Sequence, residues 1–107
     1  MSERAAAKNA SGATADATPI VRELEICNKK GLHARASAKF VQLVEKYDAE
    51  VKVRRGHETV GGTSIMGLMM LAAGPGTTIT VEASGTQAAE VIEALARLVS
   101  GRFTEEE

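Results

Sequence analysis

The chain has 107 residues, a formal net charge of -1 and one cysteine. This length suits a single domain with a modest core, while one cysteine excludes an internal disulfide and suits a reducing, cytoplasmic setting. The near-neutral charge and the 3% aromatic content exclude the basic or stacking surfaces of most nucleic-acid-binding proteins. No apolar run approaches the ~18 residues that span a bilayer, so we expect no membrane insertion.

The two ends of the chain have polar compositions. Residues 1–18 are rich in Ala, Ser, Thr and Gly. They cannot bury enough apolar surface to offset the entropy cost of ordering, which predicts a flexible tail. Residues 104–107 form an acidic end that we expect to be solvated. The sequence therefore predicts one folded domain over residues 19–103, and we expect it to be a monomer.

The first half of this domain shows three periodic segments. Alternating apolar and acidic residues predict a half-buried strand over residues 20–27. We expect Cys27, at the end of this strand, to be a small packed residue without chemistry. Large apolar residues at helical spacing predict an amphipathic helix from Ala34 to about Tyr47, with Tyr47 in the core. Alternating valines predict a second strand over residues 49–55.

The second half adds two strands and two helices. A weak strand over residues 59–62 contains glycines, which favour a sheet edge or a bulge. Ser64 then precedes a short apolar stretch without β-branching, which favours a short helix. A fourth strand is predicted over residues 77–83. Thr86 is predicted to cap a final helix with an apolar stripe, which ends at Gly101.

The predicted order of elements is βαββαβα. Four strands with alternating faces bury one face each, and three helices can cover that face. The sequence therefore predicts an α+β two-layer domain, in which a mostly antiparallel, four-stranded sheet is covered on one face by three helices.

A histidine stands directly before the first predicted helix. The first backbone N–H groups of a helix lack intrahelical partners and, with the helix dipole, they attract anions. Arg35 offers a planar guanidinium suited to phosphate oxygens, and Lys29 and Lys30 add positive charge. A neutral imidazole is a good nucleophile, so His33 in this setting suits a transient phosphohistidine. The alternative is that His33 is only a helix cap or a surface residue.

Neither a metal site nor a nucleotide site is predicted. No second His, Cys or carboxylate stands at ligand spacing near His33. No Gly-rich loop opens on a Lys-Ser or Lys-Thr pair, which argues against ATP binding. We therefore expect the chain to have no cofactor.

Two segments, GLHARASAKFVQLVEKYDAEV and TSIMGLMML, are similar to the motifs of one family. They resemble the active-site and regulatory-serine motifs of HPr, the phosphocarrier of the bacterial phosphoenolpyruvate-dependent phosphotransferase system, and the similarity extends over residues 20–103. The resemblance implies an open-faced β-sandwich. It also implies that enzyme I phosphorylates His33 on Nδ1, that Arg35 stabilises the phosphoryl group, and that an EIIA-type protein receives it. Such a chain is a carrier rather than a stand-alone enzyme.

Two positions depart from the family's usual motif. Ala36 stands where most members have proline, so we expect the first helix to form with a slightly softer start. Lys30 stands where Asn or Ser is frequent, which leaves open how the ring of His33 is oriented.

Ser64 suits the N-cap of the short helix, where a hydroxyl accepts a backbone N–H. By resemblance it also matches the serine that HPr kinase/phosphorylase modifies in many bacteria. A phosphate at this helix start should leave the helix folded and act on partners instead. Ile65, Met66 and Met69 suit an adaptable docking face. We therefore expect phosphorylation of Ser64 to slow the phosphorylation of His33 by enzyme I.

The sequence leaves the functional branch open. The phosphoryl-transfer pathway serves either sugar uptake or nitrogen-related regulation. The HARAS motif and the Met-rich helix favour the nitrogen-related branch. A second hypothesis is a regulatory binding module that acts mainly in its Ser64-phosphorylated state, although the intact His33 favours a carrier. A third is an unrelated ligand- or RNA-binding domain, against which the low aromatic content argues.

Overall fold

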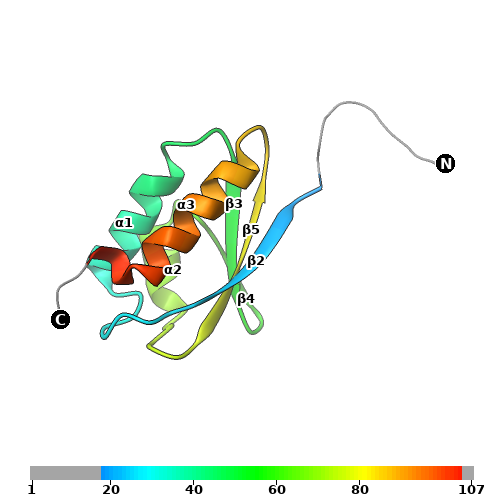
Figure 1. The fold of residues 1–107 in the computed structure, drawn as a ribbon. Coiled ribbons are helices and arrows are strands. Elements are labelled where there is room, and N and C mark those ends of the chain that lie inside the picture. Colours follow the sequence, from blue (N-terminus) through cyan, green and yellow to red (C-terminus); the bar gives the residue numbers. More distant parts are fainter. Residues whose placement is uncertain (1–17, 105–107) are drawn as a thin grey trace.

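The computed structural model describes residues 18–104, which form one sheet and one layer of helices (Figure 1). The predicted tail over residues 1–18 lies outside this range except for Thr18, and so do residues 105–107 of the predicted acidic end. None of the helices in the described range combines the length and the apolar composition that a membrane span requires. The elements in chain order are β2 (Ile20–Glu25), α1 (Ala34–Val44), β3 (Glu50–Arg55), β4 (Glu58–Gly61), α2 (Ile65–Met70), β5 (Thr78–Ser84), α3 (Ala88–Ser100) and the 3-10 turn η1 (Arg102–Thr104).

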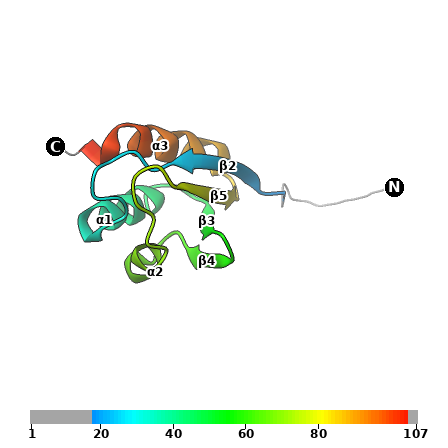
Figure 2. The same ribbon diagram turned by 90° about the horizontal axis from the view of Figure 1, so that it is seen from below.

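The four strands form one antiparallel sheet in the order β2-β5-β3-β4. Ala83 of β5 is paired with Ile20 of β2 and with Val51 of β3, so this register places the three side chains on the same face. The three helices lie against that face and leave the other face of the sheet open (Figures 1 and 2). The predicted α+β class and the open-faced β-sandwich are confirmed.

Alternation along the strands and the helix stripes builds the core. Ile79, Val81 and Ala83 of β5 are fully buried, and the polar residues between them face the open side of the sheet. Phe40 of α1 and Leu95 of α3 are also fully buried against this face. Burying a large apolar side chain contributes about 1.5–3 kcal/mol relative to leaving it exposed, so these contacts stabilise the two layers together.

Helix α1 ends at Val44, before the end predicted near Tyr47. The N–H groups of Lys46 and Tyr47 donate to carbonyls only three residues back, those of Leu43 and Val44, at 3.1 Å. Such bonds tighten the chain into turns at a helix C-terminus. The predicted helix is therefore too long, although Tyr47 is half-buried and packs against the core.

The start of α3 also differs from the prediction. Its N-cap is Gln87 rather than Thr86, and no side chain caps the helix. The Oε1 atom of Gln87 accepts the N–H of Asp48 at 2.7 Å, and the Gln87 N–H donates to the Asp48 carbonyl at 2.9 Å. This pairing ties α3 to the loop after α1, so a contact between distant segments replaces the predicted local cap.

The side chain of Cys27 is exposed, so the predicted packing is wrong. Strand β2 ends at Glu25, but the inward and outward alternation continues past its end. Ile26 and Asn28 are buried, and Cys27 between them faces solvent. The Sγ atom of Cys27 donates to the carbonyl of Val99, near the end of α3, at 3.3 Å.

Gly101 caps the end of α3, as predicted, but the chain then makes an unpredicted turn. Arg102, Phe103 and Thr104 have φ angles of 59°, 55° and 58°, which are uncommon for residues other than glycine. Phe103 is fully buried, and Lys39 Nζ of α1 donates to its carbonyl at 2.6 Å. These two contacts offset the cost of the backbone conformation and fix η1 against α1.

Candidate functional site

His33 is the N-cap of α1. Its backbone is extended, with φ -77° and ψ -178°, and its carbonyl accepts the Ser37 N–H at 2.9 Å as the helix begins. The imidazole Nδ1 accepts the backbone N–H of Arg35 at 3.2 Å. Because Nδ1 is the acceptor, a neutral ring in this position carries its proton on Nε2. The side chain is half-buried, so part of the ring stays accessible.

A tight loop leads the chain into His33. Gly31 has φ +64°, and a Cβ at this position would lie 2.3 Å from the Ala73 carbonyl oxygen. A residue with a side chain would therefore have to move the backbone as well as adopt a strained conformation. The next N–H, that of Leu32, donates to the same Ala73 oxygen at 3.0 Å. The loop is thus packed directly against the segment that leaves α2.

Positive charge gathers at this end of α1. Lys29 and Lys30 precede the histidine, Arg35 follows it, and all three side chains are exposed. Together with the N–H groups of the first turn, they make this end of the helix attractive to anions. Ala36 is fully buried under the first turn, and its N–H is a donor that a proline here would lack.

Ser64 caps α2, as the sequence predicts. Its Oγ accepts the Gly67 N–H at 2.9 Å, and its carbonyl accepts the Leu68 N–H at 3.0 Å. A Cβ at Gly67 would lie 2.9 Å from this hydroxyl and equally close to Val60, so the serine packs closely against the helix backbone. The side chain of Ser64 is nevertheless exposed, which leaves it accessible to a modifying enzyme.

Helix α2 carries an exposed apolar surface, which we call the α2 face. Leu68 points into the core and is fully buried. The α2 face consists of the exposed residues Ile65, Met66, Met69 and Met70, with Met66 and Met70 at 70% and 68% exposure. Three of the four were predicted from the sequence. Met70 was missed, although it stands four residues after Met66 and so shares its side of the helix.

The α2 face lies between Ser64 and the loop before His33. Ala73, which follows the C-terminal end of α2, accepts the Leu32 N–H, so that end of the helix adjoins the histidine loop. Ser64 stands at the other end, and six residues of α-helix span roughly 9 Å. Helices α1 and α2 also pack against each other, as Figure 2 shows. The C-terminal end of α2 and the histidine loop are therefore neighbours in the structure.

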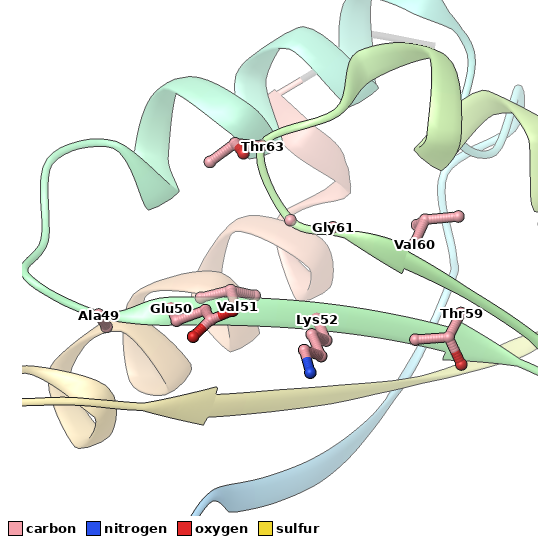
Figure 3. A pocket seen from close by; sticks show the side chains of 9 residues that line it. Ala49, Glu50, Val51, Lys52, Thr59, Val60, Gly61 and Thr63 are labelled. Carbon is pink, nitrogen blue, oxygen red and sulfur yellow. The ribbon is translucent and has the colours of Figure 1, made fainter.

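A groove of about 530 Å³ lies elsewhere, where β4 diverges from the start of β3 (Figure 3). It is lined by residues 49–52 and 59–63, and none of these is a predicted site residue. The Gly62 N–H donates to the Val51 carbonyl at 2.7 Å at the point where the two strands separate. The groove is therefore a consequence of how β4 leaves the sheet, and it does not contain the histidine.

An ion pair joins the edge of the sheet to α3. The guanidinium of Arg22 donates to the Glu93 carboxylate at 2.8 Å. This hydrogen bond and the accompanying charge attraction hold the pKa of Glu93 below its ordinary value and raise the pKa of Arg22. Both groups are exposed, so solvent screening keeps the contribution to stability small.

Comparison with known proteins bears on this arrangement. The family model described as "PTS HPr component phosphorylation site" matches residues 20–101. The chain belongs to the HPr family of phosphocarrier proteins. The HPr match includes both the histidine loop and α2, so the family assigns the chain a phosphocarrier role in the phosphotransferase system.

The alignments of this chain with individual relatives cover nearly the whole length of each relative. The phosphocarrier protein HPr of Neisseria meningitidis is 50% identical over 88 residues, which cover 82% of this chain and 99% of that protein. The phosphocarrier protein NPr of Shewanella violacea is 40% identical over 88 residues, with 82% and 97% covered. The crystal structure of HPr-C-His from Thermoanaerobacter tengcongensis superposes with a TM-score of 0.78 at 38% identity and covers 82% of this chain and 99% of that one.

Asn28 is a site residue that the sequence did not single out. In the sequence it belongs to a polar loop, NKKG, which gives no sign of burial. In the structure its side chain is fully buried, and Nδ2 donates to the Gly31 carbonyl at 2.9 Å. The only available signal was its position two residues after Ile26, on the buried side of the alternation.

Proposed function

We propose that His33 accepts a phosphoryl group on Nδ1 from phosphorylated enzyme I and passes it to an EIIA-type protein. The observation that carries the proposal is the 3.2 Å hydrogen bond in which Nδ1 accepts the Arg35 N–H, since an acceptor nitrogen has its lone pair unprotonated. The lone pair attacks phosphorus, and the Nδ1–P bond forms as the bond from phosphorus to enzyme I breaks. The released electron pair stays on enzyme I, and the ring keeps its Nε2 proton.

The first turn of α1 supplies donors for the transferred group. Once Nδ1 is bonded to phosphorus, the Arg35 N–H loses its acceptor, and a phosphoryl oxygen takes that place. The N–H groups of Ala34 and Ala36 lack intrahelical partners and add further donors. The Arg35 guanidinium stabilises the charge of the group during its transfer. The phosphoryl group then passes to the EIIA-type protein by a second displacement. In this step phosphorylated His33 is the donor, the Nδ1–P bond breaks, and its electron pair returns to Nδ1.

The exposed α2 face is the docking surface for both protein partners in this proposal. His33 is half-buried at the start of α1, outside the groove in Figure 3, so part of the residue is accessible to a partner protein. Met66 and Met70 are the most exposed large apolar side chains of the described residues. Flexible methionine side chains adapt to more than one partner, which suits a carrier that meets a donor and an acceptor in turn.

Ser64 is the proposed regulatory site, modified by a kinase of the HPr kinase/phosphorylase type. Its hydroxyl is exposed and stands at the start of α2, where free N–H groups tolerate a phosphate. The added charge would border the α2 face and disfavour the docking of an acidic partner. Phosphorylation of Ser64 therefore slows the loading of His33 without unfolding the domain.

The acceptor defines the branch in which this cytoplasmic carrier works. Relatives named HPr and NPr both match over about the same length. The chain serves a sugar-uptake or a nitrogen-related route according to which EIIA-type protein takes phosphate from it. Incubating the phosphorylated chain with purified sugar-specific and nitrogen-related EIIA proteins separates the two routes by their transfer rates.

The decisive test of the carrier role uses enzyme I and phosphoenolpyruvate. We expect the wild-type chain to gain one acid-labile phosphate and the His33→Ala variant to gain none. His57→Ala is the matched control, because His57 is exposed in the turn between β3 and β4 and is the other histidine of the chain. Acid-stable label, or label that persists in His33→Ala, would refute the proposal.

A further inference from the structure

Asn28 and Ser37 form what we call the buried polar pair. They are the polar residues that are fully buried within residues 18–104, each with 0% exposure. Burying a polar side chain costs free energy unless it is hydrogen-bonded. The hydrogen-bond partners of the buried polar pair therefore indicate which part of the structure the two side chains stabilise. Both side chains donate to backbone carbonyls of the two residues that precede His33.

Asn28 holds the loop from one side. Its Nδ2 donates to the Gly31 carbonyl at 2.9 Å, and its own carbonyl accepts the Gly31 N–H at 3.2 Å. The Gly31 oxygen also accepts the N–H of His33 at 2.9 Å. Asn28 and the backbone of His33 thus share one acceptor atom, and the side-chain amide fixes where that atom lies.

Ser37 holds the two peptide groups that flank the Cα atom of His33. Its Oγ donates to the Leu32 carbonyl at 3.3 Å, which fixes the peptide group on the N-terminal side. Its N–H donates to the His33 carbonyl at 2.9 Å, which fixes the peptide group on the C-terminal side. These two peptide groups define φ and ψ of His33 and therefore the direction in which the imidazole leaves the backbone.

We propose that the buried polar pair positions His33 for phosphoryl transfer. The inference rests on the proposed role of His33 as acceptor. The two side chains donate to the carbonyls of Gly31 and Leu32, so each acts on the backbone that leads into His33. This backbone sets the direction in which the side chain of His33 starts, and the Arg35 N–H directs the ring by binding Nδ1. The reacting nitrogen is thereby placed before a donor protein arrives.

The test compares Asn28→Ala and Ser37→Ala with a matched control, Gln87→Ala. The control also removes one bond between a side chain and the backbone, but at the other end of α1, where Gln87 accepts the Asp48 N–H. Two properties are measured: the transfer rate from phosphorylated enzyme I over a range of its concentrations, and the ¹⁵N shifts of the His33 ring. Thermal unfolding reports the stability of each variant.

We expect the maximal transfer rate of each pair variant to fall about tenfold, because misplaced reacting atoms lose rate steeply. The half-saturating concentration of enzyme I should change less than about twofold, since the docking surface is intact. The Nδ1 and Nε2 shifts of His33 should move in the pair variants and stay unchanged in Gln87→Ala, even where all three variants lose similar stability.

The outcomes separate this inference from the proposed function. A wild-type chain that gains no label from enzyme I overturns the proposed function and the inference with it. If the wild-type chain gains label and Ser37→Ala has the same transfer rate and the same ring shifts, the positioning role alone is overturned. Ser37→Ala removes one oxygen and adds no volume, so it decides the question even if Asn28→Ala does not fold.

Discussion

The Nδ1 atom of His33 and the backbone N–H of Arg35 form a 3.2 Å hydrogen bond, so the imidazole itself caps α1. The cap depends on the backbone of Arg35, whose side chain is exposed. In the proposed mechanism, the backbone N–H of Arg35 orients the ring before transfer, and its guanidinium stabilises the charge of the phosphoryl group during transfer. A substitution of the side chain separates them, because the N–H that orients the ring remains.

Arg35→Ala should keep the fold and slow the transfer of phosphate from enzyme I about tenfold, because charge-assisted donors to the phosphoryl group are lost. Initial transfer rates, with thermal unfolding as the check on folding, measure the effect. Lys52→Ala is the control, since it removes an exposed cation from the open face of the sheet. Equal rates in Arg35→Ala and the wild type would show that the guanidinium does not take part.

Ala36→Pro restores the residue that is usual in the family and removes one N–H from the first turn of α1. We expect α1 to persist. The equilibrium of phosphoryl transfer should shift about threefold toward phosphorylated enzyme I, because the phosphorylated chain loses the contribution of one hydrogen bond. The control Ala36→Gly keeps the N–H while lowering stability by about 1 kcal/mol, and its equilibrium should match the wild type. A shift in Ala36→Gly but not in Ala36→Pro would contradict the donor role.

Ser64→Asp places a carboxylate where the regulatory phosphate would stand. Aspartate is a good N-cap, so it can replace Ser64 Oγ as acceptor of the Gly67 N–H and α2 should stay folded. We expect the loading of His33 by enzyme I to slow about tenfold, since like charges oppose docking. Thr59→Asp, on the open face of the sheet, should load at the wild-type rate. Unchanged loading of Ser64→Asp would count against regulation at this position.

The double variant Met66→Ser, Met70→Ser tests the α2 face. Both side chains are exposed, so stability should change little, while the half-saturating concentration of enzyme I should rise about tenfold through lost apolar contact. Val21→Ser is the matched control, because Val21 is 54% exposed and lies in β2, the edge strand. Docking elsewhere would be indicated if Val21→Ser weakened binding as much as the double variant.

Stability should depend on pH through the Arg22–Glu93 pair. The pKa of Glu93 is lowered in the folded protein, so its stabilisation is present above the unfolded value of about 4.3 and is lost as the pH falls through the lower folded value. The melting temperature of Arg22→Ala should therefore lie below that of the wild type at neutral pH and approach it near pH ~3. A difference that stays constant across this range would exclude the pair as its source.

Much of the fold follows from periodicity in the sequence. Alternation in β5 identifies Ile79 and Val81 as core residues, and a serine before an apolar stretch identifies the N-cap of α2. These features depend on neighbours along the chain, so they are visible without the structure. The position of His33 before a helix is predictable for the same reason.

The features that escaped prediction depend on distant contacts. Gln87 replaces the expected cap because it pairs with Asp48, and Phe103 is buried by a turn that Lys39 holds. The sequence around Asn28 predicts an exposed loop residue, but its side-chain amide donates to the Gly31 carbonyl. In each case the local sequence favours a simpler conformation, and a partner far along the chain or a turn of the backbone overrides it.

In the proposed mechanism the phosphoryl group is carried on Nδ1 of His33. The decisive measurement is to phosphorylate the ¹⁵N-labelled chain with enzyme I and phosphoenolpyruvate and to record long-range ¹H–¹⁵N spectra of its two histidines. We expect the Nδ1 signal of His33 to shift and to show coupling to phosphorus, while both nitrogens of His57 stay unchanged. Coupling at Nε2 of His33, coupling at His57, or no coupling at either histidine would contradict the claim.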